Sequence, residues 1–178
     1  MLFGLFHRSK FNLASYFVTL LLFLFLSPSL SISEELTFDE ADKFYEQEDY
    51  EKAFSLLKEL EKSKDPRVYH LLGELYYYGD YVDENDEEAV HFYGLAADLD
   101  FAPSITRLGV MHEEGNFYEV NVQLANEFYF RAHELIDDEA TFFLAVNMQF
   151  GAGIEQNIPR AISFYEEAIR RGNESAVI

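Results

Sequence analysis

A run of acidic residues is the most prominent candidate for chemistry in this sequence. Residues 83–88 read Asp-Glu-Asn-Asp-Glu-Glu, and carboxylates at this density are typical of a calcium-binding loop. Such a loop needs a glycine at its sixth position for a sharp turn, and this chain has Glu88 there. Acidic residues also favour the first turn of a helix, where they meet the positive end of the helix dipole. The run therefore predicts a loop that leads into a helix, without a bound metal.

The histidines give no second route to a metal site. Four of them follow the N-terminal segment, at His70, His91, His112 and His133. Zinc on a helix needs two histidines on one face, as in His-x-x-x-His, and no pair has that spacing. His112 precedes two glutamates but lacks the second histidine of a zinc-protease motif. We predict that His112 packs within a helix and that the protein uses no metal or other cofactor.

Motifs for covalent or nucleotide chemistry are missing from the sequence. The chain has 0 Cys, which excludes a thiolate nucleophile, a disulfide scaffold and a cysteine zinc site. It has no Gly-x-Ser-x-Gly elbow, no phosphate-binding glycine loop and no dinucleotide fingerprint. With 33 Asp and Glu residues, no single carboxylate pair stands out as an acid–base dyad. We therefore predict that the protein is not an enzyme.

The charge of the chain narrows the class of partner. Among 178 residues, 13 Lys and Arg face 33 Asp and Glu, which gives a formal net charge of −20. Nucleic-acid binding needs clustered cations, so we expect no nucleic-acid partner. Apolar residues make up 49% of the chain and aromatic residues 17%, which is enough for a folded core. A protein or peptide partner that carries basic residues fits this surface best.

The first 33 residues have the composition of an export signal. Arg8 and Lys10 precede the apolar run 13–26, and Pro28 with small serines follows it. This pattern is typical of a secretory signal peptide that is cleaved before Glu34. The alternative is an uncleaved signal anchor, because the stretch 11–32 is long enough to span a bilayer. Either form places the remaining chain in the secretory pathway (the endoplasmic reticulum lumen or outside the cell), or in the periplasm if the host is bacterial. Membrane contact is then limited to this segment.

Five sequence marks repeat with a period of 36 residues through three copies. They are Leu72-Gly73, Gly79, Ala89, Phe92-Tyr93 and Ala96, and each recurs 36 and 72 residues later, with Leu144-Ala145 as the relaxed third form of the first mark. A fixed period of this length is the signature of a repeat architecture. Residues 34–64 fit only as a degenerate first hairpin, because Ala53 keeps the register while the Leu-Gly position holds Thr37. Residues 65–178 then hold three repeats with an incomplete C-terminal end.

Each repeat is predicted to consist of two helices. The first runs over 66–78, with Asp65 as its cap and Pro66 in its first turn. Gly79 follows as a left-handed residue that ends the helix. The second helix begins near Asn85 and runs to about Leu99, with the buried stripe Ala89, Phe92, Tyr93 and Ala96. No strand-like alternation occurs after the N-terminal segment.

These marks resemble those of the SEL-1-like repeat family, which is related to the tetratricopeptide repeats. The resemblance implies an all-α, right-handed α-solenoid of about four helix-turn-helix repeats that acts as a non-catalytic adaptor. The family usually has Gly-x-Gly-Val after the first helix. The segments 79–82 and 115–118 depart from this pattern, with Tyr81 and Phe117 at the second glycine, whereas 151–154 is close to it.

Two narrower roles follow from members of this family. Residues 111–115 and 124–129 are similar to the lumenal SEL-1-type adaptors of the ubiquitin ligases for endoplasmic-reticulum-associated degradation, which implies a role in protein quality control. The alternative is a bacterial periplasmic or secreted member with a hydrolase-like or host-interaction role.

The first helices are predicted to carry the partner-binding surface. With Leu72 and Tyr76 facing inward, helical spacing turns His70 and Glu74 outward. Resemblance to the family implies that this outward face is concave. The apolar members of the face are named here the first-helix stripe, and they are Tyr77, Tyr78, Val110, Phe142, Val146 and Phe150. Aromatic residues rimmed by acids are typical of a peptide-binding groove.

The C-terminal region suggests two further features. Asn173-Glu174-Ser175 is the only N-glycosylation sequon and would be modified only in a eukaryotic secretory pathway. Ala176 stands where a further first helix would begin, yet the sequence stops at Ile178. The second helix of the last repeat is therefore expected to expose a neighbour-facing surface, through which the protein forms an end-on oligomer or binds another protein.

Overall fold

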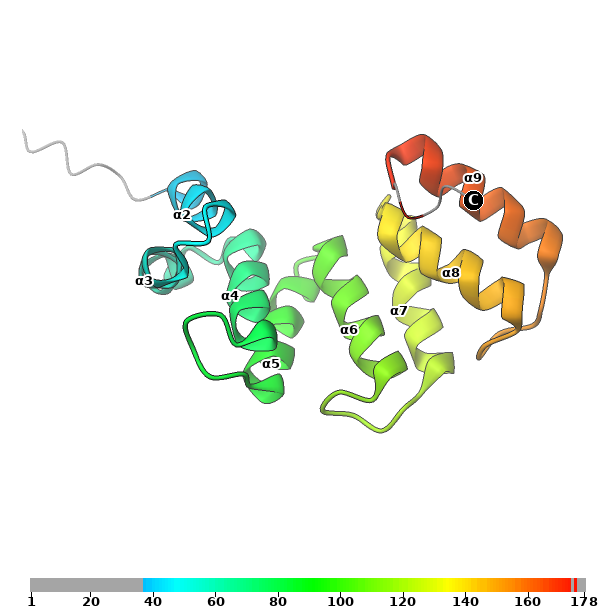
Figure 1. Ribbon diagram of the computed structural model, residues 1–178, viewed down its shortest axis with the longest axis horizontal. Coiled ribbons are helices and arrows are strands. Elements are labelled where there is room, and N and C mark those ends of the chain that lie inside the picture. Colours follow the sequence, from blue (N-terminus) through cyan, green and yellow to red (C-terminus); the bar gives the residue numbers. More distant parts are fainter. Residues whose placement is uncertain (1–36, 174, 176–178) are drawn as a thin grey trace, which may run out of the picture. The chain divides into compact units, whose positions relative to one another are not determined.

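The computed structural model describes residues 37–173 and residue 175. These residues form eight α-helices and a short 3₁₀-helix, and they contain no strand, as the sequence predicts. The α-helices in chain order are α2 (Phe38–Glu46), α3 (Tyr50–Leu60), α4 (Pro66–Tyr78), α5 (Asp86–Ala97), α6 (Ala102–Glu114), α7 (Val122–Glu134), α8 (Asp138–Phe150) and α9 (Ile158–Arg171). Figure 1 shows their order. The predicted signal segment, residues 1–33, lies outside the described residues.

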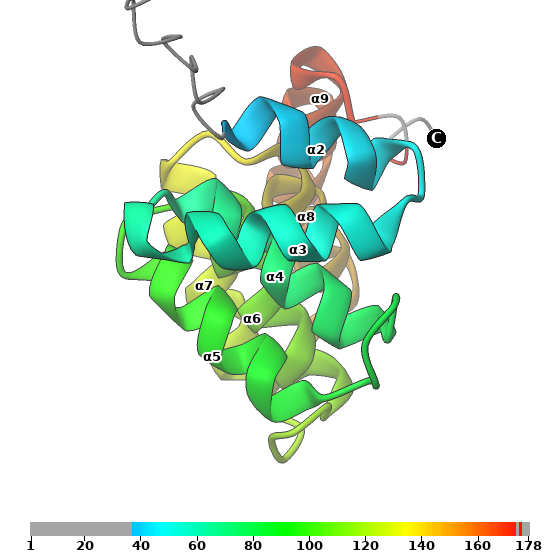
Figure 2. The ribbon, with the colours of Figure 1, turned by 90° about the vertical axis from the view of Figure 1, so that its left-hand side faces the viewer.

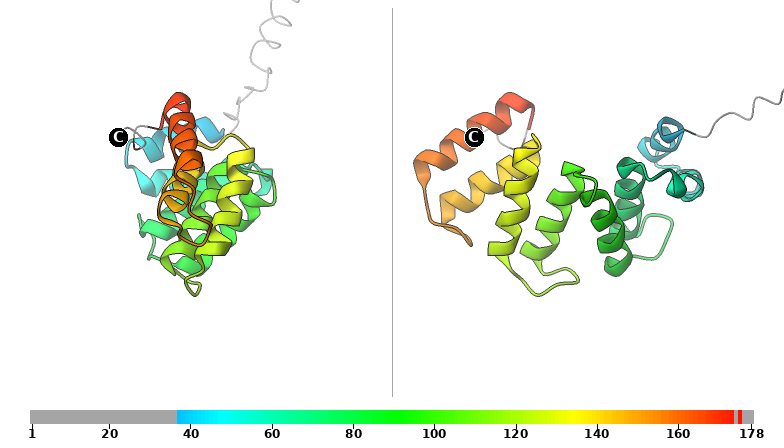
Figure 3. Two further views of the ribbon diagram at one scale, coloured as in Figure 1. Left: turned by 90° about the vertical axis from the view of Figure 1, so that its right-hand side faces the viewer. Right: turned by 180° about the vertical axis from the view of Figure 1, so that it is seen from behind.

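The helices pack as four consecutive pairs, α2 with α3, α4 with α5, α6 with α7 and α8 with α9. Each pair also contacts the next, with α3 against α4, α5 against α6 and α7 against α8. Figure 2 shows the first pair beside α4, and Figure 3 shows the pairs following one another toward α9. This arrangement confirms the predicted α-solenoid of helical repeats. Within the described part of the chain, no helix is both long and apolar enough to cross a bilayer.

The helix ends follow the sequence repeat closely. Gly79, Gly115 and Gly151 end the three first helices at φ values of +71°, +82° and +73°. This left-handed conformation is open to glycine because it has no Cβ. The second helices are capped by Asn85, Asn121 and Asn157, each of which accepts a hydrogen bond from the amide three residues on. The acidic run 83–88 is therefore a loop and a helix N-terminus, as predicted.

The core alternates small residues on the helices with large aromatic rings. Ala89, Ala96 and Tyr93 of α5 are buried, and so are their counterparts in α7 and α9. The rings of Tyr93 and Tyr129 lie directly against Gly73 and Gly109 of the preceding helix. A Cβ atom on these glycines would come within 2.6 Å and 2.5 Å of the respective ring. Glycine is thus required here by the close approach of two helices.

The hydroxyl groups of these buried tyrosines are all satisfied by first helices. Tyr129 donates to Glu113 at 2.7 Å, and Tyr165 donates to Gln149 at 2.7 Å, in both cases 16 residues earlier. The matching position for Tyr93 is itself a tyrosine, so the Tyr93 hydroxyl donates to Glu74 at 2.6 Å instead. One substitution in the repeat has thus redirected a buried hydrogen bond.

The first hairpin is tighter than the three that follow it. Residues 47–49 join α2 to α3, whereas residues 79–85 join α4 to α5. A shorter connection shifts α2 along the sequence relative to the 36-residue period, although Ala53 of α3 stays in register and is buried. Thr37, which stands 36 residues before Gly73 of the Leu-Gly pair, therefore lies before the start of α2. The buried small residue of this helix is Ala41 instead.

The last helix, α9, exposes apolar side chains along one side. Ile158, Ile162 and Ile169 are all exposed, although Asn126, the counterpart of Ile162 one repeat earlier, is buried. Asn126 is covered because its side chain donates to the carbonyl of Ala152 and accepts from Asn147. Among the described residues, α8 is the main packing partner of α9. Residues 174 and 176–178 lie outside these residues, so the end-on oligomer stays a prediction.

Candidate functional site

The two ends of the first-helix stripe are exposed. Tyr78 is 53% exposed and Phe150 is 71% exposed. Both are the last residue of a first helix, and Glu114 takes the corresponding place in α6. The structure therefore leaves Tyr78 and Phe150 available to a partner, with a carboxylate at the equivalent position between them in the sequence.

The other four residues of the stripe are half-buried, because each packs against a neighbour. Tyr77 reaches the next repeat, where its hydroxyl donates to Glu114 at 3.2 Å and accepts from Asn116 at 3.0 Å. The Phe142 ring lies 5.8 Å from that of Tyr165. Val110 and Val146 line the apolar core. These residues are only partly accessible to a partner. Partner binding by the stripe stays a prediction.

Glu74 is buried, which corrects the prediction that it faces outward. Its carboxylate accepts hydrogen bonds from Tyr93 and from the Arg107 guanidinium at 2.9 Å. Arg107 also donates to Glu139 at 3.3 Å, so one cation links α4, α6 and α8. Burial raises the pKa of the Glu139 carboxyl, and burial together with the nearby Glu74 charge raises the pKa of Tyr93. A buried carboxylate is tolerated here because it is paired and hydrogen-bonded.

His70 is half-buried and contacts the next repeat, contrary to the prediction of an outward position. Its Nδ1 lies 2.9 Å from the Ser104 hydroxyl of the next repeat, and its ring lies against Tyr93 and Phe101. Burial lowers the pKa of His70 to about 4, with Arg107 acting in the same direction and Glu74 opposing it. The neutral imidazole is therefore part of the joint between two repeats.

From the contact between His70 and the next repeat, we predict that the folded protein loses stability in acid. Because the folded pKa of His70 is below its unfolded value of about 6.5, its contribution is complete above that pH and is lost as the pH falls toward 4. The loss for His70 alone is at most about 3.5 kcal/mol, at roughly 1.4 kcal/mol per pKa unit. Urea unfolding between pH 7 and pH 4 should show a shallower pH dependence for His70→Gln than for the unchanged chain. Equal dependence would mean that His70 is not a source of the acid sensitivity.

His112 packs as a helix residue, as the sequence predicts. Its ring stacks on Tyr118 at 4.0 Å and on Phe128 at 5.4 Å. Among residues 37–173 and 175, no three His, Asp or Glu side chains are grouped so as to hold a metal ion. Asn173 follows the end of α9 and is half-buried, while the next residue of its sequon lies outside the described set. Its glycosylation stays a prediction.

Two loop aromatics belong to the exposed surface and were not among the predicted site residues. Tyr81 and Phe117 follow the first helices, and both are exposed with φ values of +70° and +64°. The third repeat has Gly153 at this position, with a φ of +62°. Because the left-handed conformation suits glycine, a large ring at this point is a departure from the local rule. Both residues could have been identified from the sequence as candidate surface residues, because each stands where the family's loop pattern has its second glycine.

Comparison with protein families and solved structures agrees with this architecture. The model of the Sel1 repeat matches residues 66–101, 102–135 and 138–173. No curated protein matches the sequence. A Sel1 repeat protein from Oxalobacter formigenes has a similar fold, with a TM-score of 0.73 and 22% identity over 79% of this chain and 57% of that one.

Two further bacterial structures share the fold. A protective antigen of uropathogenic Escherichia coli with an SLR fold has a TM-score of 0.63 and 22% identity over 70% of this chain and 27% of that one. Helicobacter pylori cysteine rich protein B has a TM-score of 0.54 and 23% identity over 67% of this chain and 91% of that one. The chain thus spans 57% and 27% of the first two structures. The matched repeats cover more than half of the sequence, and the chain belongs to the Sel1 repeat family.

Proposed function

We propose that this protein is a non-catalytic adaptor that binds a partner protein on its first-helix stripe. Proteins with Sel1 repeats are generally scaffolds for protein–protein interaction and are generally non-catalytic. The observation that carries the proposal is the exposure of Tyr78 and Phe150 at equivalent places on α4 and α8. Exposed aromatic side chains on the same helices as half-buried apolar residues are typical of interface anchors.

The proposed partner carries basic residues. The formal charge of −20 attracts cations over the whole surface, and Glu114 and Glu139 lie on the same helices as the stripe. Association should therefore slow as salt is added, because screening weakens attraction between separated charges. The uncovered side of α9 is a second proposed contact surface, for end-on association through its isoleucines.

The proposed location is beyond a membrane, in the secretory pathway or in a bacterial periplasm. This proposal rests on the composition of residues 1–33, whose acid-free basic and apolar run is typical of an export signal. The narrower role in quality control within the endoplasmic reticulum rests on the resemblance of 111–115 and 124–129 to lumenal adaptors. The mass of the N-terminus of protein isolated from its host would test cleavage before Glu34.

Affinity purification with variants tests the proposed surface. The double variant Phe142→Ala and Phe150→Ala should lose the partner that the unchanged chain retains, because interface anchors contribute about 2 kcal/mol or more each. Leu99→Ala is the matched control, since Leu99 is an exposed apolar residue in the turn between α5 and α6. Helicity by circular dichroism should be the same in all three proteins. Retention of the partner by the double variant would reject the stripe as the binding surface.

A further inference from the structure

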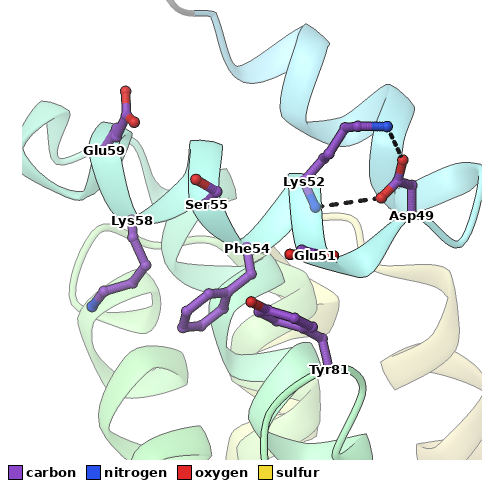
Figure 4. Close-up of a pocket in the computed structure, with 8 residues that line it drawn as sticks. All are labelled: Asp49, Glu51, Lys52, Phe54, Ser55, Lys58, Glu59 and Tyr81. Atoms are coloured by element: carbon purple, nitrogen blue, oxygen red, sulfur yellow. Dashed lines mark hydrogen bonds and ion pairs between the residues drawn. The ribbon is translucent and has the colours of Figure 1, made fainter.

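A hollow of about 710 Å³ lies between α3 and the loop that joins α4 to α5. Phe54 projects from α3 and Tyr81 from the loop, and the two rings lie next to each other, tilted by 55° with centroids 5.8 Å apart (Figure 4). Phe54 is half-buried and also contacts Tyr76 of α4, which fixes its position. The hollow is thus an open surface site with one anchored aromatic wall and one exposed aromatic wall.

The conformation of Tyr81 is unfavourable for a residue with a side chain. Its φ is +70°, and the equivalent position in the third repeat is Gly153. Tyr81 is 57% exposed, so packing within its own chain uses less than half of the ring. A residue held in this region of φ and ψ without a full packing gain is a candidate for binding something outside the core.

The charges around the hollow favour a cation. Both of its lysines are already paired, Lys52 with Asp49 and Lys58 with Glu61. Two carboxylates that line the hollow, Glu51 and Glu59, form no ion pair among the described residues. An exposed phenol ring in a hollow that unpaired carboxylates also line attracts a positive group both through its π face and through charge.

We propose that this hollow binds an arginine side chain in a segment of a partner protein. The guanidinium lies flat against the Tyr81 ring and donates hydrogen bonds to neighbouring carboxylates such as Glu51. Arginine fits better than lysine because its planar group stacks on an aromatic face and donates in a fork to a carboxylate. This site lies on α3, a second helix, and is separate from the first-helix stripe, so it does not depend on the function proposed above.

The test measures binding of a fluorescein-labelled peptide of alternating arginine and serine to the full chain by fluorescence anisotropy. Tyr81→Gly should weaken binding by about tenfold, the effect of losing a partly desolvated cation–π contact. Glycine suits the positive φ of this position, so the variant should melt at no lower temperature than the unchanged chain. Tyr81→Phe should bind as tightly as the unchanged chain, because the ring remains.

Phe117→Gly is the matched control. It is the same kind of change in the next repeat, at a residue with the same exposed, positive-φ setting, and it leaves the net charge unchanged, as Tyr81→Gly does. We expect Phe117→Gly to bind the peptide normally and the matching lysine–serine peptide to bind the unchanged chain less tightly. The proposal is overturned if Tyr81→Gly binds normally, if Phe117→Gly loses as much affinity, or if the lysine peptide binds equally well. Tyr81-dependent binding to phosphatidylcholine vesicles without peptide binding would also overturn it, in favour of a lipid surface.

Discussion

Replacing Gly109 by alanine should lower the free energy of unfolding by about 2 kcal/mol, the usual scale for overpacking a core. The added Cβ would lie 2.5 Å from Cε1 and 2.8 Å from Cδ1 of Tyr129. That ring cannot move aside easily, because it is fully buried, its hydroxyl donates to Glu113, and it stacks on Phe143. The clash outweighs the gain of up to about 1 kcal/mol that alanine usually brings to a helix interior. Urea unfolding at neutral pH measures the difference.

Gly94 provides the control for this substitution. It also lies inside a helix, α5, but a Cβ there would meet nothing within 4 Å. Gly94→Ala should therefore stabilise the protein by roughly 0.5–1 kcal/mol through helix propensity alone. Equal effects of the two substitutions would show that the close approach of α6 to Tyr129 is wrong.

Replacing Arg107 by leucine should lower the free energy of unfolding by about 3 kcal/mol, the usual effect of removing one partner of a buried ion pair. Arg107 joins Glu74 of α4 to Glu139 of α8, and without it the buried Glu74 carboxylate keeps only the Tyr93 hydroxyl as a partner. Burial raises the pKa of Glu139, because a carboxylate charge in this region is poorly solvated. A carboxylate left without its cation is therefore unfavourable here. Urea unfolding at neutral pH measures the loss of stability.

The double variant Arg107→Leu and Glu74→Gln separates charge from packing. Glutamine can still accept the hydrogen bond of Tyr93, and it leaves no buried charge behind. It should therefore recover most of the stability that Arg107→Leu loses. If the double variant is as unstable as the single one, lost packing of the arginine stem is the cause, and the ion pair is not what stabilises the joint.

Helix positions could be predicted from the sequence because their signals are local. Gly79, Gly115 and Gly151 mark helix ends, and asparagines mark helix starts, at fixed places in each repeat. Each of these signals acts within a few residues, so one copy of the repeat is enough to read it. The buried stripe of α5 was equally readable, since small and aromatic residues recur at helical spacing.

The burial of Glu74 and the half-burial of His70 could not be predicted in this way. Helical spacing places both on the outer side of α4, and both are polar, so the sequence of one helix favours exposure. Their partners are Arg107 and Ser104, more than 30 residues away on the next first helix. Only the packing of repeats side by side brings these groups together, and the same packing half-covers Tyr77 and Phe142.

The location of exposed aromatic residues was only partly foreseen. Tyr78 and Phe150 are exposed as the stripe requires, whereas Tyr81 and Phe117 lie in loops that the family pattern assigns to glycine. Such a departure from the repeat pattern is informative, because the positive φ of this position favours glycine for a physical reason. The hollow beside Tyr81 also needs Phe54 from the first hairpin, which the 36-residue period did not align.

Site-specific photo-crosslinking tests the central claim, that the first-helix stripe receives the partner, most directly. A photoreactive phenylalanine analogue would be placed at Phe150 in one protein and at Leu99 in another, since both positions are exposed and apolar. The account predicts a crosslink to the purified partner from position 150 and none from position 99. Equal crosslinking from both positions, or crosslinking from position 99 alone, would contradict it.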